Sequence, residues 1–596
     1  MTRRWLALCV VVIALIVAAT FMPATRLNFY ADDYSFVEIA GRSTLPDYLA
    51  FYFDPRAQTG WYRPLQGMLF GGEWLLFGAN PVGYHVVNVI VHAANCLLLF
   101  ALVWRVARRA LPALSAALVY AGMPLHNVAV FWPGDADFLL TFFYLLAIFF
   151  WLGFIQPAVS LASSRFTSRA ARVTLYVLSF IFFLCALLTK EFGVTLPVSL
   201  FLADVLLVRE KIRFAVRVRR YAPFALVWLV YLPLELSIQS RSVLTNVYGY
   251  GFGAHTLPNF FQYLAWLAFP WGLPEPANYV WLGAATGIVA GVIVVKRNGT
   301  LLFLALMATL AFLPVINFPW FFTRYLYFAV MATAIVLAGL VAWARKFIAP
   351  KWFALAWASG IALIVAGNAF GVAQAAAEFA EIGRQTRVPF RDISQRHPSL
   401  PADTHLYFID PPTITSQLSG MFFLRYGAGI SVASNEAAQW RARWREHANA
   451  YVIYFDEQKR TREILVDQQA AIEMQPRTPL DFGAGLRLVA LAMPSTRAKR
   501  GDAFAVFLEW QATGAIEKNY AVTLRLLDAT GRTITQVDAE PRGGMPPMTV
   551  WRPGETITDA RVVFVPTDAP PGVCRLVIAL VGVDEPTATI APLRIE

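Results

Sequence analysis

The sequence predicts a polytopic α-helical membrane protein with about eleven spanning helices, followed by a folded region outside the membrane. Of the 596 residues, 58% are hydrophobic and only 15% are charged, whereas soluble domains carry about 25% charged residues. Aromatic residues make up 14% of the chain, which is typical of a protein with many Trp and Tyr anchors at the membrane surface. The net charge of +12 is explained by basic residues kept in cytoplasmic loops, so we expect no nucleic-acid partner.

The helices are predicted from apolar runs that are long enough to cross a bilayer. These runs occur at 5–24, 85–103, 110–128, 138–154, 173–189, 192–208, 222–238, 277–295, 301–317, 325–343 and 352–370. Because their number is odd, the two termini are expected on opposite sides of the membrane. The segment 260–271 is apolar but short, and we expect it to lie on or dip into the outer surface.

The distribution of basic residues predicts the orientation. With the amino terminus inside, the cytoplasmic segments hold nineteen Lys and Arg residues and the opposite loops hold seven. This bias favours a cytoplasmic amino terminus and an extracytoplasmic carboxyl-terminal region. The long first external loop, 25–84, is rich in aromatic residues and is expected to form amphipathic helices at the surface.

Composition and periodicity divide the chain into three parts. Residues 1–370 are the membrane domain, 371–476 an extracytoplasmic α/β segment, and 477–596 a β-sandwich. The α/β segment is predicted from strand-like runs at 404–410 and 450–456, and the sandwich from regularly spaced short strands separated by turn residues.

The predicted topology gathers several ionisable residues at external helix ends. They come from separate loops and comprise Asp32, Asp33, Arg63, Asp135, Asp137, Lys190, Glu191 and Arg324, with Tyr325 next to the last and His126 beside the acidic loop. Ionisable groups at such places belong to the membrane surface or to a wet cavity. Their grouping predicts a site on this face, at which a carboxylate could take a proton, hold a cation or bind a metal ion.

Each of these residues also has an ordinary structural interpretation. Asp32, Asp33, Asp135 and Asp137 could cap helices or lie in solvated loops. Lys190 and Glu191 could form a structural ion pair, and Arg324 could be an interfacial anchor. His85 and His92 lie seven residues apart, not at the four-residue spacing of a zinc pair, and the four cysteines show no disulfide or zinc pattern.

Five segments, in order along the chain, resemble a known superfamily. They are Tyr62–Leu65; Asn80–Asn88 with His92; Met123–Asp137; Leu188–Pro197; and Phe312–Asn317 with Arg324–Tyr327. The chain resembles the GT-C superfamily of membrane glycosyltransferases, and most strongly the protein O-mannosyltransferase branch and the membrane part of the transmembrane and tetratricopeptide-repeat proteins. No tetratricopeptide repeats follow; the carboxyl-terminal part resembles the β-sandwich of some bacterial enzymes of this type.

The resemblance implies a catalytic base at Asp32. In the superfamily an acidic pair, commonly Asp-Glu, occupies the first external loop, and its first Asp takes the proton from the acceptor. Here Asp33 stands in place of the Glu, so the choice between the two aspartates stays open. The resemblance further implies a polyprenyl-phosphate sugar as donor and a hydroxyl of a glycan, lipid or protein as acceptor.

The expected function is therefore hexosyl transfer from a polyprenyl-phosphate carrier, on the outer face of a bacterial cytoplasmic (inner) membrane. Asp135, Asp137, His126, Lys190, Glu191, Arg324, Tyr325 and Arg63 are the expected substrate-binding residues. A divalent metal ion held by the carboxylates is left open. A transporter or lipid flippase, with the acids as a proton or cation site, is the alternative; its ionisable groups would be expected nearer the bilayer midplane. A non-catalytic scaffold with a degenerate site is the third interpretation.

Overall fold

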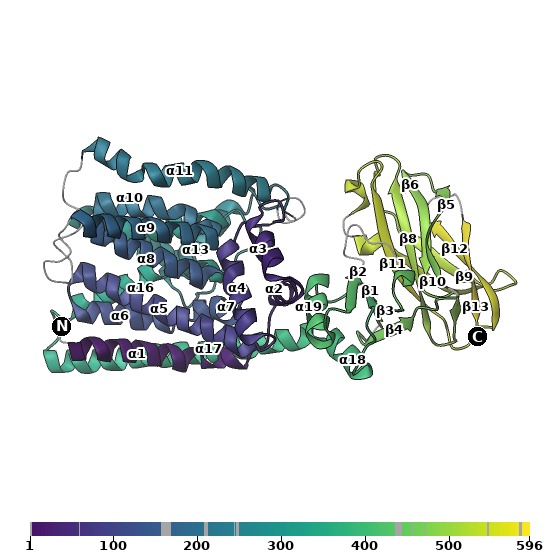
Figure 1. Ribbon diagram of the computed structural model, residues 1–596, viewed down its shortest axis with the longest axis horizontal. Helices are drawn as coiled ribbons and strands as arrows, with labels where there is room; N and C mark the ends of the chain where they lie inside the picture. The colour runs from purple at the N-terminus through teal and green to yellow at the C-terminus, as the bar shows by residue number, and fades with distance from the viewer. Residues whose placement is uncertain are drawn as a thin grey trace. The chain divides into compact units, whose positions relative to one another are not determined.

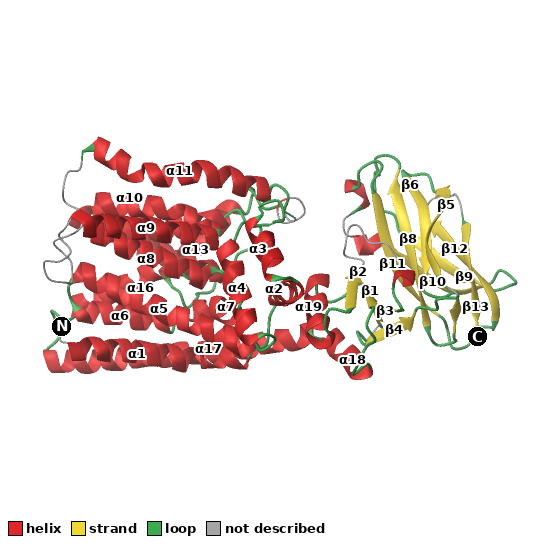
Figure 2. Ribbon diagram, in the orientation of Figure 1, coloured by secondary structure: helices red, strands yellow, loops and turns green. Residues whose placement is uncertain are grey.

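The computed structural model describes residues 3–58, 60–155, 169–207, 213–242, 245, 249–434, 444–456, 458–469, 471–544, 547–582 and 587–596. The chain divides into two compact units, Met1–Gly383 and Arg384–Glu596. Figure 1 shows that the first unit is built of helices, and Figure 2 shows that the strands lie in the second. The three-part division at 370 and 476 stays a prediction.

The first unit is a bundle of long helices with short helices at one end (Figure 1). Its elements are α1 (Arg3–Phe21), η1 (Met22–Arg26), α2 (Asp33–Arg42), α3 (Leu45–Phe53), α4 (Pro64–Phe77), α5 (Pro81–Ala107), α6 (Ala110–Ala121), η2 (Pro124–His126), α7 (Asn127–Phe131), α8 (Asp137–Ile155), α9 (Arg169–Thr189), η5 (Glu191–Thr195), α10 (Leu196–Leu206), α11 (Phe214–Gln239), α13 (Thr256–Ala268), α14 (Ala277–Lys296), α15 (Gly299–Phe312), η6 (Leu313–Val315), η7 (Thr323–Leu326), α16 (Met331–Ala344) and α17 (Pro350–Thr386).

The polytopic helical fold is confirmed. In the described ranges, seven helices are long and apolar enough to cross a membrane: α1 with η1, α5, α8, α9, α11, α14 and α17. The pair formed by α6 with η2 and α7 is bent by 53° and would make an eighth span. The other predicted spans coincide with shorter apolar helices, namely α10 with 11 residues and α15 and α16 with 14 each.

The helices α10, α15 and α16 are shorter than the predicted spans because 3-10 helices, and not continuous α-helix, lie next to them. The segment η5 precedes α10, η6 continues α15, and η7 comes shortly before α16. In a membrane protein, backbone outside regular helices is tolerated where protein buries it or water reaches it. These breaks carry Glu191 and Arg324, two of the residues predicted for the site.

The local sequence explains why α5 begins at Pro81. Asn80 precedes α5, and its side-chain oxygen accepts a hydrogen bond from the Val82 N–H at 3.1 Å. Pro81 occupies the first helical position, where its missing N–H costs nothing. Further along α5, His92 Nδ1 lies 2.6 Å from Tyr327 Oη, and Asn95 Nδ2 donates to the Phe138 carbonyl at 2.9 Å. These buried contacts tie α5 to α8 and to the segment after η7.

The loop 25–84 contains three short helices, α2, α3 and α4, as expected, while their place at the outer membrane surface stays a prediction. They gather at one end of the bundle in Figure 1. Tyr48 of α3 donates a hydrogen bond to the Gly67 carbonyl of α4 at 2.7 Å. The predicted short helix at 260–271 is present as α13.

The second unit combines a small α/β part with a two-sheet sandwich. Its elements are α18 (Val388–Arg396), β1 (Thr404–Phe408), α19 (Thr415–Tyr426), β2 (Ile430–Ser434), η8 (Trp444–Glu446), β3 (Asn449–Phe455), β4 (Thr461–Leu465), β5 (Ile472–Asp481), β6 (Leu486–Met493), β7 (Arg497–Ala498), β8 (Ala503–Ala512), β9 (Val522–Leu527), β10 (Thr533–Ala539), η9 (Pro541–Gly544), η10 (Met548–Val550), β11 (Thr556–Phe564), β12 (Gly572–Leu580) and β13 (Ala588–Ile595).

The sheets have simple topologies. The first has the order β2-β1-β3-β4, with parallel pairing of β2, β1 and β3 and antiparallel pairing of β3 with β4. The sandwich sheets have the orders β10-β9-β12-β13-β7 and β11-β8-β6-β5. Alternating strand residues form the sandwich core, with Trp510 and Leu524 both fully buried in it.

A buried ion pair joins the two sandwich sheets. Arg561 and Asp559 lie on β11 with side chains 5% and 2% exposed, and Arg561 Nε donates to Asp559 Oδ2 at 2.8 Å. Arg561 also donates to the carbonyls of Val522 and Ala539, which belong to β9 and β10 of the other sheet. The guanidinium is therefore satisfied on three sides.

We predict that Arg561→Met destabilises the second unit by about 3–5 kcal/mol, because it leaves the Asp559 carboxylate buried and unpaired. Denaturant unfolding of the full chain in detergent, with hydrogen exchange followed on β9–β11, measures this. The exposed Arg575 of β12 is the control, since Arg575→Met removes the same charge from the surface. Equal destabilisation by both substitutions would contradict the prediction.

Candidate functional site

The two adjacent aspartates at the start of α2 have different environments. Asp33 is fully buried, and its carboxylate accepts hydrogen bonds from the N–H of Tyr30 at 2.8 Å and the N–H of Gly134 at 2.6 Å. A Cβ on Gly134 would lie 2.8 Å from Asp33 Oδ1, so only glycine fits there. Burial raises the pKa of Asp33 well above its usual range, against these hydrogen bonds. Asp33 thus holds the turn before α8 against the start of α2.

Asp32 is the available carboxylate of the pair. It is exposed, occupies the N-cap position of α2 and makes no capping hydrogen bond. Within the described residues, its side chain has no hydrogen bond or ion pair. Although the Asp32 side chain is exposed, the protein around it keeps part of the water away from its carboxylate. This desolvation raises the pKa of Asp32, while Arg324 and Arg63 act to lower it. A charged, unpaired carboxylate near two guanidinium groups can accept a proton.

Asp135 and Asp137 form a linked pair at the start of α8. Asp135 Oδ1 accepts a hydrogen bond from the Asp137 N–H at 2.7 Å, so the predicted role in starting the helix is observed for Asp135. Asp135 Oδ2 also lies 3.8 Å from Arg324 Nε. Burial alone would raise the pKa of Asp135, but Lys190 and Arg324 outweigh it and hold the pKa below its usual value.

Lys190 pairs with Asp137 across a distance of 53 residues in the sequence. Its Nζ lies 2.7 Å from Asp137 Oδ1, and both side chains are about 95% buried, with 4% and 5% exposed. The ammonium also lies 4.7 Å from the ring centre of Phe192 and 4.9 Å from that of Tyr325. The second oxygen of Asp137, Oδ2, is buried without a hydrogen-bond partner in the described part of the chain.

Arg63 and Glu191 form a two-point ion pair. Arg63 precedes α4; its Nε donates to Glu191 Oε2 at 2.9 Å and its Nη2 to Oε1 at 2.8 Å. Trp61 lies against the guanidinium, 4.5 Å from ring centre to Cζ. Glu191 is therefore bound to Arg63, not to its neighbour Lys190 as the predicted structural pair would have it.

Arg324 is held mainly by aromatic rings. Its Cζ lies 4.7–5.0 Å from the ring centres of Phe322, Trp132 and Tyr325. Its Nη2 donates to Tyr325 Oη at 3.2 Å, and Asp135 at 3.8 Å is beyond normal hydrogen-bond length. Of the three cations, Arg324 thus has the loosest carboxylate partner.

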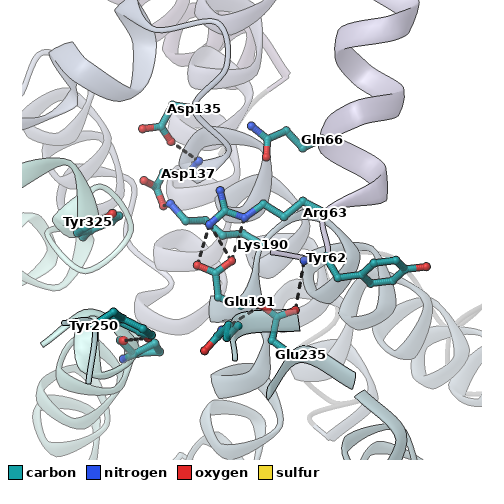
Figure 3. A network of polar contacts seen from close by, with 12 residues as sticks. Tyr62, Arg63, Gln66, Asp135, Asp137, Lys190, Glu191, Glu235, Tyr250 and Tyr325 are labelled. Atoms are coloured by element: carbon teal, nitrogen blue, oxygen red, sulfur yellow. Dashed lines mark hydrogen bonds and ion pairs between the residues drawn. The ribbon is translucent and has the colours of Figure 1, made fainter. Parts of the chain in front are cut away.

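The structure therefore brings nine of the predicted residues into one cluster of three cations and their acids. The pairs are Arg63–Glu191, Lys190–Asp137 and Arg324–Asp135. Figure 3 shows the Arg63 guanidinium directed at Glu191 and the Lys190 ammonium directed at Asp137. The members lie at the starts of α2, α4, α8 and η5 or in the residues just before them, and in η7.

His126 lies in a different environment from the other predicted residues. Its ring is fully buried, 4.2 Å from the centre of Tyr120, 4.7 Å from Tyr327 and 5.0 Å from His92. No contact between His126 and the charged cluster is found among the described residues. Its substrate-binding role stays a prediction.

Glu235 and Gln66 belong to the site but were not identified from the sequence. Glu235 of α11 accepts hydrogen bonds from the Tyr62 N–H at 3.3 Å and from Gln239 Nε2 at 3.0 Å, so it holds the segment that carries Arg63 (Figure 3). Gln66 of α4 donates to the Gly134 carbonyl. An acid inside an apolar run was the available signal for Glu235; nothing in the sequence pattern marks Gln66.

No group of three or more His, Cys, Asp and Glu side chains that could hold a metal ion is found in the described part of the chain. The cluster instead offers one free carboxylate beside cations. That arrangement can take a proton from a hydroxyl and stabilise a nearby anion.

Comparison with known proteins gives a consistent but partial likeness. No family model matches the chain. Mouse Protein O-mannosyl-transferase TMTC4 is 32% identical over 150 residues, which is 22% of this chain and 19% of that protein. Drosophila melanogaster Protein O-mannosyl-transferase Tmtc3 is 30% identical over 161 residues, 23% of this chain and 16% of that protein. The predicted resemblance to protein O-mannosyl-transferases is confirmed over these stretches, although the chain spans less than a fifth of the curated relatives' length.

Two solved structures resemble larger parts of the chain. ArnT from Cupriavidus metallidurans bound to undecaprenyl phosphate matches with a TM-score of 0.48 and 15% identity, covering 77% of this chain and 94% of that one. The Archaeoglobus fulgidus oligosaccharyltransferase in the apo form matches with a TM-score of 0.43 and 12% identity, covering 99% and 98%. Both TM-scores are below 0.5, and we draw no conclusion from them.

Beside the site, Glu73 of α4 is a buried acid without a partner. It is 3% exposed, and neither carboxylate oxygen has a hydrogen-bond partner among the described residues. Burial, with added repulsion from Asp33, raises the pKa of Glu73 from 4.5 to about 9. The folded state therefore retains a proton that the unfolded state has already lost between these two values.

We predict that wild-type stability falls relative to Glu73→Gln as pH rises from 4.5 to about 9, by at most about 1.4 kcal/mol per pH unit. The sign follows because the folded state binds more protons than the unfolded state over this window. Thermal unfolding of both proteins in detergent from pH 5 to 9 measures the difference, and the control is Glu38→Gln, a partly exposed acid of α2 that is paired with Arg42 at 2.8 Å. A pH-independent difference would contradict the prediction.

Proposed function

We propose that the protein is a glycosyltransferase that moves a sugar from a polyprenyl-phosphate carrier to an acceptor hydroxyl. The observation that carries the proposal is the division of labour between the two aspartates: Asp33 is occupied by backbone hydrogen bonds, and Asp32 is free beside Arg324 and Arg63. The likeness to protein O-mannosyl-transferases supports the reaction class.

In the proposed reaction the acceptor oxygen attacks the anomeric carbon of the donor. A new carbon–oxygen bond forms while the bond from that carbon to the phosphate oxygen breaks, and its electron pair stays on the phosphate. Asp32 takes the hydroxyl proton, because its carboxylate is the unpaired one. General-base catalysis of this kind contributes about 10²–10⁴-fold to the rate.

The departing polyprenyl phosphate needs positive charge, and Arg324 is the group best placed to supply it. Lys190 is bound to Asp137 at 2.7 Å and Arg63 to Glu191 through two hydrogen bonds. Arg324 lies 3.8 Å from its carboxylate, so a phosphate oxygen can approach its guanidinium without displacing a tight ion pair. Lys190 and Arg63 then add charge from fixed positions.

The charged loops give the proposed location. We place the reaction on the outer face of a bacterial cytoplasmic membrane, with the amino terminus inside and the β-sandwich outside, because the basic residues concentrate in the opposite loops. The acceptor is a hydroxyl of a glycan, lipid or protein, and the sandwich is a candidate module for binding it.

We predict that Asp32→Asn lowers sugar transfer by at least about 100-fold, because the amide cannot take the acceptor proton. Purified protein in detergent is incubated with radiolabelled polyprenyl-phosphate sugars and candidate acceptors, and label transfer is counted. Glu38→Gln, an acid on the same helix, is the control and should retain wild-type transfer. Full transfer by Asp32→Asn would remove Asp32 from its role; proteoliposome flux without sugar transfer would favour the transporter alternative.

We predict a second, pH-dependent signature of the same base. Activity requires the deprotonated Asp32 and is lost as pH falls through its pKa, which desolvation raises and Arg324 lowers. Arg324→Gln removes the lowering interaction, so the acid limb of the kcat/KM profile should move to higher pH. Arg42→Gln on α2 is the matched control. An unmoved acid limb, whatever the overall rate, would contradict the assignment of Asp32 as the titrating base.

A further inference from the structure

Arginine side chains also meet at the opposite end of α8 and α9 from the site. Arg105 of the last turn of α5 has its Cζ 5.4 Å from the Phe149 ring, and a Cβ on Gly153 would lie 3.3 Å from its Nη2. Arg172 of α9 and Arg220 of α11 both lie over the ring of Phe154, at 5.7 and 5.1 Å. Three helices thus direct guanidinium groups to the last turns of α8.

Arg105 has no carboxylate partner in the part of the chain that the structure describes. It is 6% exposed, and it makes no hydrogen bond or ion pair within the described residues; the Nε atoms of Arg105 and Arg172 are both buried and unpartnered there. Asp204 is the acid observed at this end in the described ranges, and it pairs with Arg220 at 3.2 Å and Arg217 at 3.8 Å. Of the two segments at this end that lie outside the described part, residues 156–168 contain no Asp or Glu, and residues 208–212 contain one acid, Glu210, among Arg209 and Lys211.

An unpaired buried guanidinium is costly, and the surrounding protein offsets little of that cost. The C-terminus of α5 and the ring of Phe149 each favour a nearby cation only weakly, compared with the cost of an uncompensated buried charge. A bound anion would supply the missing compensation, and the planar guanidinium fork matches a phosphate with two hydrogen bonds.

The surface next to these arginines is apolar. Val173, Val177 and Ile181 of α9 are 55%, 44% and 44% exposed, and their four-residue spacing places them in one stripe. The helices α9 and α11 pack together beside it, since Tyr176 Oη donates to the Arg220 carbonyl at 2.8 Å. An anion that also carries hydrocarbon chains fits this combination better than a free ion does.

We propose that the phosphate of an anionic glycerophospholipid binds Arg105, Arg172 and Arg220, with an acyl chain along the α9 stripe. The site lies at the other end of the bundle from Asp32 and does not depend on the proposed transferase activity. Its ligand stabilises the bundle by neutralising Arg105, and the basic loops around it attract anionic lipid to this surface.

The test is lipid binding by the full-length protein purified in a non-ionic detergent. Phosphatidylglycerol, phosphatidylcholine and inorganic phosphate are added separately, and bound lipid is counted by native mass spectrometry alongside the unfolding temperature. We expect one retained phosphatidylglycerol and a raised unfolding temperature for the wild type, with neither effect from phosphatidylcholine. Arg172→Gln should weaken phosphatidylglycerol binding about tenfold, the loss of one charge-assisted hydrogen bond.

Two variants keep the test decisive. Arg345→Gln, exposed at the end of α16, removes the same charge and should bind phosphatidylglycerol as the wild type does. Arg105→Lys keeps the buried charge but loses the fork, so it should fold and bind more weakly. Equal binding by Arg172→Gln and Arg345→Gln would overturn the proposal. Full stabilisation by inorganic phosphate alone would overturn the assignment to a lipid.

Discussion

The geometry of the candidate site depends on one buried carboxylate, that of Asp33. Asp33 uses its two oxygens to bind the N–H groups of Tyr30 and Gly134, and so fastens the start of α2 to the turn that delivers Asp135 and Asp137 to α8. Adjacent helix positions point about 100° apart, so fixing Asp33 inward turns Asp32 away from those contacts. Gly134 completes the constraint, because a side chain there would collide with Asp33.

The ion pairs around this fixed point differ in strength, and the difference gives them different uses. Buried ion pairs add little net stability, because desolvation cancels most of their attraction, but they hold geometry firmly. Two ion pairs hold geometry in this way: Lys190–Asp137 at 2.7 Å, and Arg63–Glu191 through two hydrogen bonds. Arg324, with ring contacts and a carboxylate at 3.8 Å, keeps bonding capacity for an incoming anion.

Much of this arrangement could be predicted from the sequence, and the rest depended on contacts that periodicity does not encode. Apolar runs located the helices, and topology gathered the charged residues at one end, because both follow from local composition. Arg63 pairs with Glu191, which is 128 residues away, and the sequence around neither residue predicts this pair. The different environments of Asp32 and Asp33 depend on the backbone of Gly134, which is far away in the sequence. Glu235 stood out as an acid inside an apolar run, but its contact with the Tyr62 N–H could not be predicted from that run.

The two ends of the bundle show why the partners of buried charges matter more than the charges themselves. At the site, Arg63, Lys190 and Arg324 each face an acid from another segment, which the short 3-10 helix η5 and the loops around it bring into reach. At the other end, α5 and α8 finish close to Arg105, and no carboxylate of the described residues pairs with it. The free carbonyls of a helix C-terminus only partly balance a buried cation, which is why we propose that an anion from the membrane completes this end of the bundle.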